Sequence, residues 1–216
     1  MYKNIYVDMD GTIINSEHGV IHGITYALEQ NGYEVPEYST LRSCIGPPFT
    51  YSFPNILHVK DEDFFKVVKS YRDIYDREVM FDCEIYPGVA DFLKRMANKG
   101  YSITLASSKD EDACKKILEK FDVAQYFTEV VGASIYKKID TKTLVLQECF
   151  NRCPWHKKEE TVLVGDTRYD VVGAVETGID CIGITYGFGT REDLFAHGAK
   201  AVFNDLIEVA EYIEKQ

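Results

Sequence analysis

The sequence lacks several features that mark common classes of protein. No uninterrupted apolar run approaches the ~20 residues that a membrane-spanning helix needs. The first residues carry no basic stretch followed by an apolar one, so we expect no secretory signal. No internal repeat and no low-complexity segment is found along the chain. These absences favour a globular protein that works in the cytoplasm and has no membrane partner.

Positive charge and paired cysteines are also scarce. The chain has 24 Lys and Arg against 35 Asp and Glu, and its formal net charge of −11 argues against a nucleic-acid polymer as partner. A small anionic substrate stays compatible, because lysines and a metal ion at one site outweigh the global field. The six cysteines form no C-x-x-C pair, and no zinc site is completed around Cys149 and Cys153. We expect buried thiols in a reducing cytosol.

Strand-like and helix-like segments alternate over the second part of the chain. The 216 residues are 45% hydrophobic, which is enough for one packed domain with a small insert. The expected strands are 101–106, 129–131, 161–164, 181–185 and 201–203. The expected helices are 88–99, 110–121, 142–150, 170–177 and 205–214. This alternation predicts parallel strands joined by helical crossovers.

The first expected strand, residues 3–7, is separated from the others by a stretch with helical spacing. That stretch has predicted helices at 16–34 and 39–44 and another that begins near Asp61, a possible N-cap. We therefore predict an α/β fold with a Rossmann-like parallel-sheet core and an inserted α-helical cap domain. The core is expected to comprise residues 1–15 and 86–216, and the cap residues 16–85.

Two carboxylates follow the first strand directly. Asp8 and Asp10 stand at its carboxyl end, where open α/β sheets bind ligands, and Gly11 follows at once. Acids held close together repel, which raises the pKa of one of them, and a divalent cation removes that cost. Asp8 then suits a nucleophile and metal ligand, and Asp10 a proton carrier. On this stretch alone, an Asp-Gly turn that merely ends a strand is an equally good interpretation.

Further polar side chains follow other expected strands. Ser107 and Ser108 come after the strand 101–106, where a hydroxyl and backbone N–H groups can hold a phosphate oxygen or can cap a helix. Lys142 opens an expected helix, where it opposes the helix dipole, so a functional use competes with a plain surface position. Asp166 and Asp170 follow the strand 161–164. Together with the two N-terminal acids they suit a hard, oxygen-liganded cation such as Mg²⁺, unless they only cap a helix.

Taken together, these motifs resemble those of the haloacid dehalogenase-like hydrolase superfamily. Its four motifs are matched in order by Asp8-Met9-Asp10-Gly11-Thr12, by Ser107, by Lys142, and by Gly165-Asp166 with Asp170. The resemblance covers essentially the whole chain. Within the insert, Gly46-Pro47-Pro48 and Tyr71-Arg72 resemble the cap of the phosphoglycolate phosphatase-like branch, which includes 5′-nucleotidases.

The resemblance implies a role for each matching acid. Asp8 would attack phosphorus and form an aspartyl-phosphate. Asp10 would protonate the leaving alcohol and then deprotonate the attacking water. Mg²⁺ would be held by the carboxylates of Asp8 and Asp166 and by the backbone carbonyl of Asp10, with Asp170 orienting the site.

The resemblance also implies which groups hold the phosphoryl oxygens. These are Ser107, the backbone N–H of Ser108, and Lys142. Lys137 and Lys138 lie near Lys142 and compete for the lysine role. The spacing of Lys142 from the glycine at 132 and its place at a helix start favour Lys142.

The resemblance implies a Mg²⁺-dependent phosphatase that hydrolyses a small phosphorylated metabolite, such as phosphoglycolate, a nucleoside monophosphate or a sugar phosphate. The alternatives are a β-phosphoglucomutase-like phosphotransferase and a non-catalytic binding protein on the same fold. We expect substrate specificity to come from the cap residues Arg42, Gly46, Phe49 and Arg72. The protein is expected to be a monomer or a homodimer.

Overall fold

The computed structural model describes residues 1–134 and 137–216. The chain divides into two compact units. The first, which we call the core unit, comprises Met1–Asn15 and Ile85–Gln216, and the second, the helical unit, comprises Ser16–Glu84. Within the described part of the chain, none of the helices combines the length and apolar character that crossing a bilayer requires.

A parallel sheet forms the centre of the core unit. The described residues give it six strands in the order β5-β4-β1-β6-β7-β8. Their bounds are β1 (Asn4–Val7), β4 (Ser102–Asp110), β5 (Glu129–Ala133), β6 (Thr161–Gly165), β7 (Asp180–Ile184) and β8 (Ala201–Phe203). Because β1 lies between β4 and β6, the carboxyl ends of these three strands meet where the strand order reverses, which is where such sheets bind ligands. The predicted Rossmann-like parallel sheet is confirmed.

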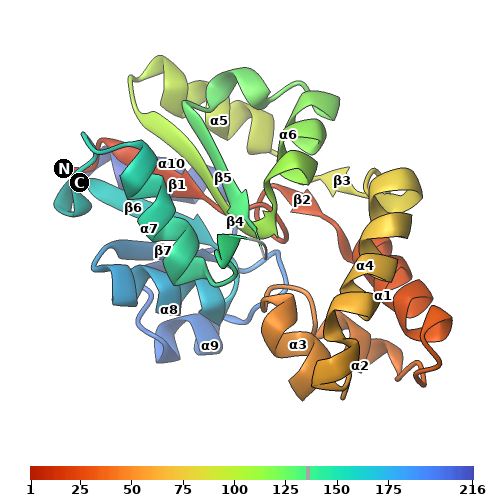
Figure 1. Ribbon diagram of the computed structural model, residues 1–216. Coiled ribbons are helices and arrows are strands. Elements are labelled where there is room, and N and C mark those ends of the chain that lie inside the picture. Colours follow the sequence, from red (N-terminus) through yellow and green to blue (C-terminus); the bar gives the residue numbers. More distant parts are fainter. Residues whose placement is uncertain (135–136) are drawn as a thin grey trace. The chain divides into compact units, whose positions relative to one another are not determined.

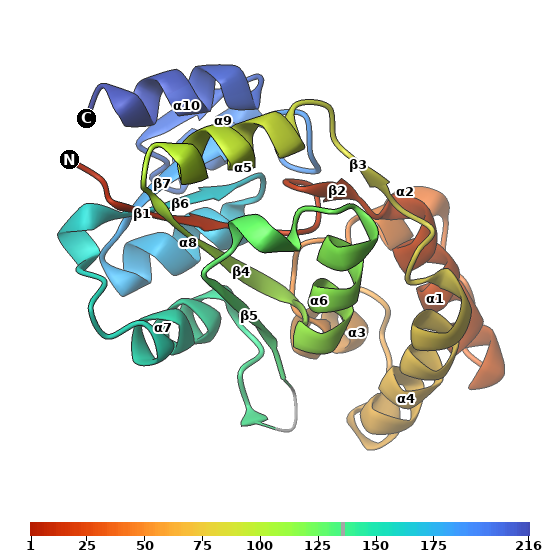
Figure 2. The same ribbon diagram turned by 90° about the horizontal axis from the view of Figure 1, so that it is seen from above.

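Helices cover both faces of this sheet (Figures 1 and 2). On one face lie α5 (Val89–Asn98) and α10 (Leu206–Glu214), and on the other lie α7 (Lys142–Arg152) and α8 (Arg168–Thr177). The unit also contains α6 (Glu111–Lys120) and α9 (Arg191–Ala196). The helix α5 buries the four side chains that helical spacing predicts, Val89, Phe92, Leu93 and Met96. Each such burial contributes about 1.5–3 kcal/mol to folding.

The middle of β1 is anchored by Tyr6. Its ring is fully buried, packs against Phe150 at a centroid distance of 5.4 Å, and places its hydroxyl 3.0 Å from His156 Nδ1. The other ring nitrogen of His156 lies 3.0 Å from the hydroxyl of Ser102, at the start of β4. This network therefore joins β1 to β4, the two strands whose ends carry Asp8 and the serines.

We expect His156 to make the protein less stable on mild acidification. The residue is 6% exposed, and burial lowers the pKa of His156 from its ordinary 6.5, because the charged ring loses its hydration. The unfolded chain therefore takes up this proton more readily, so the stabilising contribution is complete above about pH 6.5 and is lost as the pH falls below it.

Thermal unfolding of the wild type and of His156→Gln at about pH 8 and about pH 5.5 measures this effect. The fall in Tm between the two pH values should be larger in the wild type by roughly 2 °C or more. Equal falls in both proteins would show that His156 does not carry the acid sensitivity.

The helical unit contains α1 (Glu17–Gln30), α2 (Tyr38–Arg42), α3 (Phe49–Asn55) and α4 (Phe64–Ile74), which continues into a π-helical turn, Tyr75–Val79. The predicted N-cap at Asp61 is wrong, because Asp61 lies inside a 3₁₀ turn, Asp61–Asp63, and α4 begins after it. The helix α3 was not predicted, since it is only seven residues long and contains Pro54. Where the chain passes between the units, β2 (Ile14–Asn15) pairs with β3 (Glu84–Ile85).

Candidate active site

Asp8 and Lys142 form a buried ion pair at the end of the sheet. Asp8 follows β1 directly and is 7% exposed, and its Oδ1 accepts a hydrogen bond from Lys142 Nζ at 2.6 Å. The same ammonium donates to the carbonyl of Ala106 at 2.8 Å and lies 2.7 Å from Asp170 Oδ1. Three oxygens thus hold one ammonium out of water, which gives this end of the sheet a positive charge at a defined place.

Local packing explains why Lys142 reaches this position. It opens α7, whose N-cap Thr141 accepts a hydrogen bond from a backbone N–H in the first turn. On the adjacent helix α8, a Cβ at Gly173 would lie 2.6 Å from Lys142 Cγ, so the glycine leaves room for the lysine stem. The two competing lysines, Lys137 and Lys138, are both exposed.

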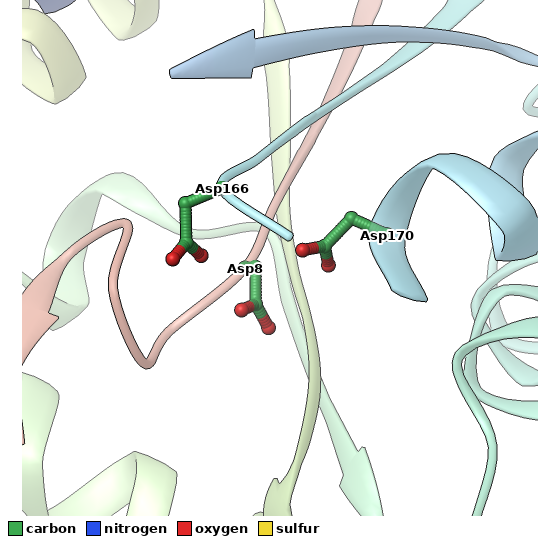
Figure 3. A group of neighbouring side chains, drawn as sticks. All are labelled: Asp8, Asp166 and Asp170. Atoms are coloured by element: carbon green, nitrogen blue, oxygen red, sulfur yellow. The ribbon is translucent and has the colours of Figure 1, made fainter. Parts of the chain in front are cut away.

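Three carboxylates from different elements lie close together at this end of the sheet (Figure 3). Asp8, Asp166 and Asp170 are all buried, and each offers an oxygen that lies within 4.8 Å of those of the other two. Burial raises the pKa of Asp8 to about 7, although Lys142 opposes the shift. Burial and the negative charges of Asp170 and Asp8 also raise the pKa of Asp166 well above its usual range. A hard divalent cation fits this donor set, because it would neutralise carboxylates that one lysine balances only in part.

Asp166 is held by the loops around it. Thr12 Oγ1 donates to Asp166 Oδ1 at 3.2 Å, and the Phe188 backbone N–H donates to Oδ2 at 2.7 Å. Gly11 has φ +85°, and a Cβ there would lie 2.1 Å from Asp166 Oδ2. A Cβ at Gly187 would lie 2.2 Å from the same oxygen. The two glycines therefore allow the backbone to close around the carboxylate.

Asp170 has two roles in the structure. Its Oδ2 accepts hydrogen bonds from the Thr167 backbone N–H at 3.0 Å and hydroxyl at 2.9 Å, and these contacts cap α8. Its Oδ1 lies 2.7 Å from Lys142 Nζ. The resemblance implies that Asp170 orients the site, and this role stays a prediction. The structure places the Asp170 carboxylate among the oxygens of the acid cluster.

Asp10 points to a different partner. Its Oδ1 lies 3.1 Å from Lys109 Nζ, and its carboxylate is outside the acid cluster found among the described residues. The implied metal contact of Asp10 is through its backbone carbonyl and stays a prediction. Lys109 was not singled out from the sequence, although it directly follows the two serines that are predicted to bind phosphate.

The serines lie within β4 rather than after it. The strand runs to Asp110, with an irregularity between Ser107 and Asp110 in its pairing with β5, so the predicted end at residue 106 is too early. Ser107 is 1% exposed, and its hydroxyl accepts a hydrogen bond from the Lys109 N–H at 3.2 Å. The buried hydroxyl oxygen of Ser108 has no hydrogen-bond partner in the described part of the chain. The phosphate-binding role of both serines stays a prediction.

The four predicted specificity residues all lie in the helical unit. Arg42 pairs with Glu17 at 3.2 Å. Gly46 adopts φ +105° in the loop before α3. Phe49 packs against two other aromatic rings at centroid distances of 4.7 Å, so it contributes to the interior of this unit. Arg72 is half-buried on α4. Their part in substrate choice stays a prediction.

Comparison with known proteins places the chain among phosphatase-like sequences. A family model described as haloacid dehalogenase-like hydrolase matches residues 5–184. The chain is 24% identical over 213 residues to a 5′-nucleotidase of Pseudomonas aeruginosa, with 99% of this chain and 96% of that protein covered. It is 23% identical to a phosphoglycolate phosphatase of Vibrio parahaemolyticus, with 98% and 96% covered.

Solved structures give the same result. The structure of a protein from Clostridium acetobutylicum, described as a predicted phosphatase, superposes with a TM-score of 0.95 at 31% identity, and the match covers 100% of both chains. The similarity in fold therefore extends over the strands that carry Asp8, Lys109 and Asp166 as well as over the helical insert.

Proposed function

Because the chain belongs to the haloacid dehalogenase-like hydrolase family, we propose that it hydrolyses small phosphomonoesters through an aspartyl-phosphate on Asp8. The observation that carries this proposal is the buried Asp8 carboxylate, 2.6 Å from the Lys142 ammonium and close to two further buried acids. Relatives named 5′-nucleotidase and phosphoglycolate phosphatase support phosphomonoesters as the substrate class.

In the first step, an oxygen of Asp8 forms a bond to phosphorus while the bond from phosphorus to the leaving alcohol oxygen breaks. Asp10, in its protonated form, gives its proton to that oxygen, so the alcohol leaves neutral. Lys142 stabilises negative charge on the phosphoryl oxygens as it develops, because it is already fixed and desolvated. Ser107 and Ser108 hold the same oxygens.

In the second step, a water oxygen attacks phosphorus and Asp10 takes up the proton of that water. The bond from phosphorus to Asp8 then breaks, which releases inorganic phosphate and regenerates the carboxylate. Asp8, Asp166 and the Asp10 carbonyl would hold Mg²⁺, with Asp170 beside them, and the ion when bound supplies neutralising charge to the phosphoryl group.

Phosphate release from a panel of substrates tests the proposal. The panel contains phosphoglycolate, nucleoside monophosphates and sugar phosphates, each assayed with Mg²⁺ and after exhaustive chelation. We expect turnover of at least one of them and a loss of at least ~100-fold on chelation, because the acid cluster then lacks its counter-charge.

Restoration of activity by added Mg²⁺ is the control for damage during chelation. Undiminished turnover without metal would contradict the metal role. Recovery of the phosphoryl group on a sugar, in place of inorganic phosphate, would favour the phosphotransferase alternative.

A further inference from the structure

Lys109 is unusually buried for a lysine. Its side chain is 6% exposed, and its Nζ lies 3.1 Å from Oδ1 of Asp10, whose side chain is 16% exposed. Lysine is almost never buried in this way unless its ammonium has a charged partner. An ion pair that is largely removed from water loses much when one partner is deleted, because the other charge stays behind. The contact with Asp10 therefore helps to fix the position of the Lys109 ammonium, and the ammonium in turn helps to fix the Asp10 carboxylate.

The backbone around Lys109 is held on several sides. Its N–H donates to the Ser107 hydroxyl at 3.2 Å, and its carbonyl lies 3.9 Å from Cys114 Sγ. On β5, a Cβ at Gly132 would lie 2.7 Å from the same carbonyl and 2.4 Å from Glu111 Cα. The glycine thus permits β5 to approach the irregular end of β4, from which Lys109 leaves. A lysine stem on such a constrained backbone delivers its ammonium to a defined point.

Two lysines contact different acids of this site. Lys142 contacts Asp8 and Asp170, which belong to the acid cluster. Lys109 contacts Asp10, whose carboxylate lies outside that cluster. The two ammonium groups come from different elements, the end of β4 and the start of α7. Lys109 can therefore act on Asp10 without altering the pair between Lys142 and Asp8.

We propose that Lys109 is a positioning residue for Asp10, an inference that rests on the proposed function. By binding Oδ1, Lys109 fixes the plane of the Asp10 carboxylate and leaves Oδ2 to pass a proton to the leaving oxygen and later to take one from water. Lys109 itself neither gains nor loses a proton in either step. The consequence depends on the leaving group, since a phenolate with electron-withdrawing substituents departs without a proton and an alkoxide does not.

Lys109→Met tests this dependence. We expect kcat/KM, which reports the step that releases the leaving group, to fall ~10–100-fold on an alkyl phosphate and less than ~3-fold on p-nitrophenyl phosphate. Lys109→Arg, which keeps a charged donor, should recover part of the loss. Lys116→Met removes an exposed lysine of α6 and is the matched control. A merely structural role for Lys109 would lower kcat/KM on both substrates equally, and that result would overturn the proposal.

A double-mutant cycle sharpens the test. In an Asp10→Asn background, Lys109→Met should have no further effect on the alkyl phosphate, because the group that it positions is gone. Full additivity of the two losses would also overturn the proposal.

Crystal structures of the wild type and Lys109→Met provide a measure that does not depend on activity. We expect the Asp10 carboxylate to rotate or to adopt several conformers in the variant, and an unchanged Asp10 would contradict its positioning by Lys109. Failure of the proposed function would instead appear as a wild type that releases no phosphate from any substrate, whatever these structures show.

Discussion

An Asp8→Asn variant is expected to fold normally and to lose at least ~10⁴-fold in kcat on every phosphomonoester. The amide keeps the shape of the side chain but removes the proposed nucleophile. The substitution also removes a carboxylate whose charged form is disfavoured in the folded protein, since burial raises the pKa of Asp8 to about 7. We therefore expect no loss of folding stability. Lys142 keeps its contacts with Asp170 and with the carbonyl of Ala106. The measurements are kcat and Tm of the purified variant.

A covalent label locates the nucleophile directly. Wild-type protein that is quenched during turnover of a ³²P-labelled substrate should carry the label on the peptide that contains Asp8. The matched control is Asp91→Asn, which changes an exposed acid of α5 and should leave both turnover and labelling intact. Label recovered on any other residue would refute the assignment of Asp8.

Lys142→Met should damage stability and activity together. It leaves the carboxylates of Asp8 and Asp170 buried beside each other without the ammonium that now contacts both. Removal of one partner from a buried ion pair costs roughly 3–5 kcal/mol of unfolding free energy. We also expect kcat to fall ~10³-fold, since the fixed charge that we propose for stabilising the phosphoryl oxygens is lost.

The pH dependence of this variant has a definite sign. Without Lys142, the pKa of Asp8 in the folded protein rises further above that of the unfolded chain, because Lys142 is the group that opposes the shift. The folded state then binds the proton more tightly, so stability is present at low pH and is lost as the pH rises.

Urea unfolding at about pH 5 and about pH 8 should therefore show the larger loss of stability at the higher pH. Lys137→Met, at one of the exposed lysines that competed for this role, is the control and should change neither property. A loss that is the same at both pH values would show that the charge of Lys142 is not what the fold requires.

The sequence predicted those features that depend on local patterns. The strand before Asp8 and the buried face of α5 follow from residues that are neighbours along the chain. The sequence also placed Asp8 and Asp166 at strand ends, because strand–helix alternation sends parallel strands to the same edge.

The contacts between these residues could not be predicted from the sequence. Lys142 and Asp8 are 134 positions apart, and whether Lys142 or Lys137 faces the acids depends on how α7 packs on the sheet. The extension of β4 through Ser107 depends on pairing with β5, which local spacing does not reveal. Lys109 was missed for the same reason. A lysine after two serines looks solvent-exposed until the fold brings Asp10 to it.

The central place of β1 has a consequence for how the protein is made. This strand is synthesised first, yet its neighbours are β4 and β6, which begin at Ser102 and Thr161. At ~5–20 residues per second, the edge of β1 that pairs with β4 stays unpaired for roughly 5–20 s, and the edge that pairs with β6 for roughly 8–30 s. The nascent chain thus exposes an apolar strand until most of the chain has been translated. The carboxylate of Asp8 is among the last groups to form its contacts, because Lys142, Asp166 and Asp170 all lie late in the sequence.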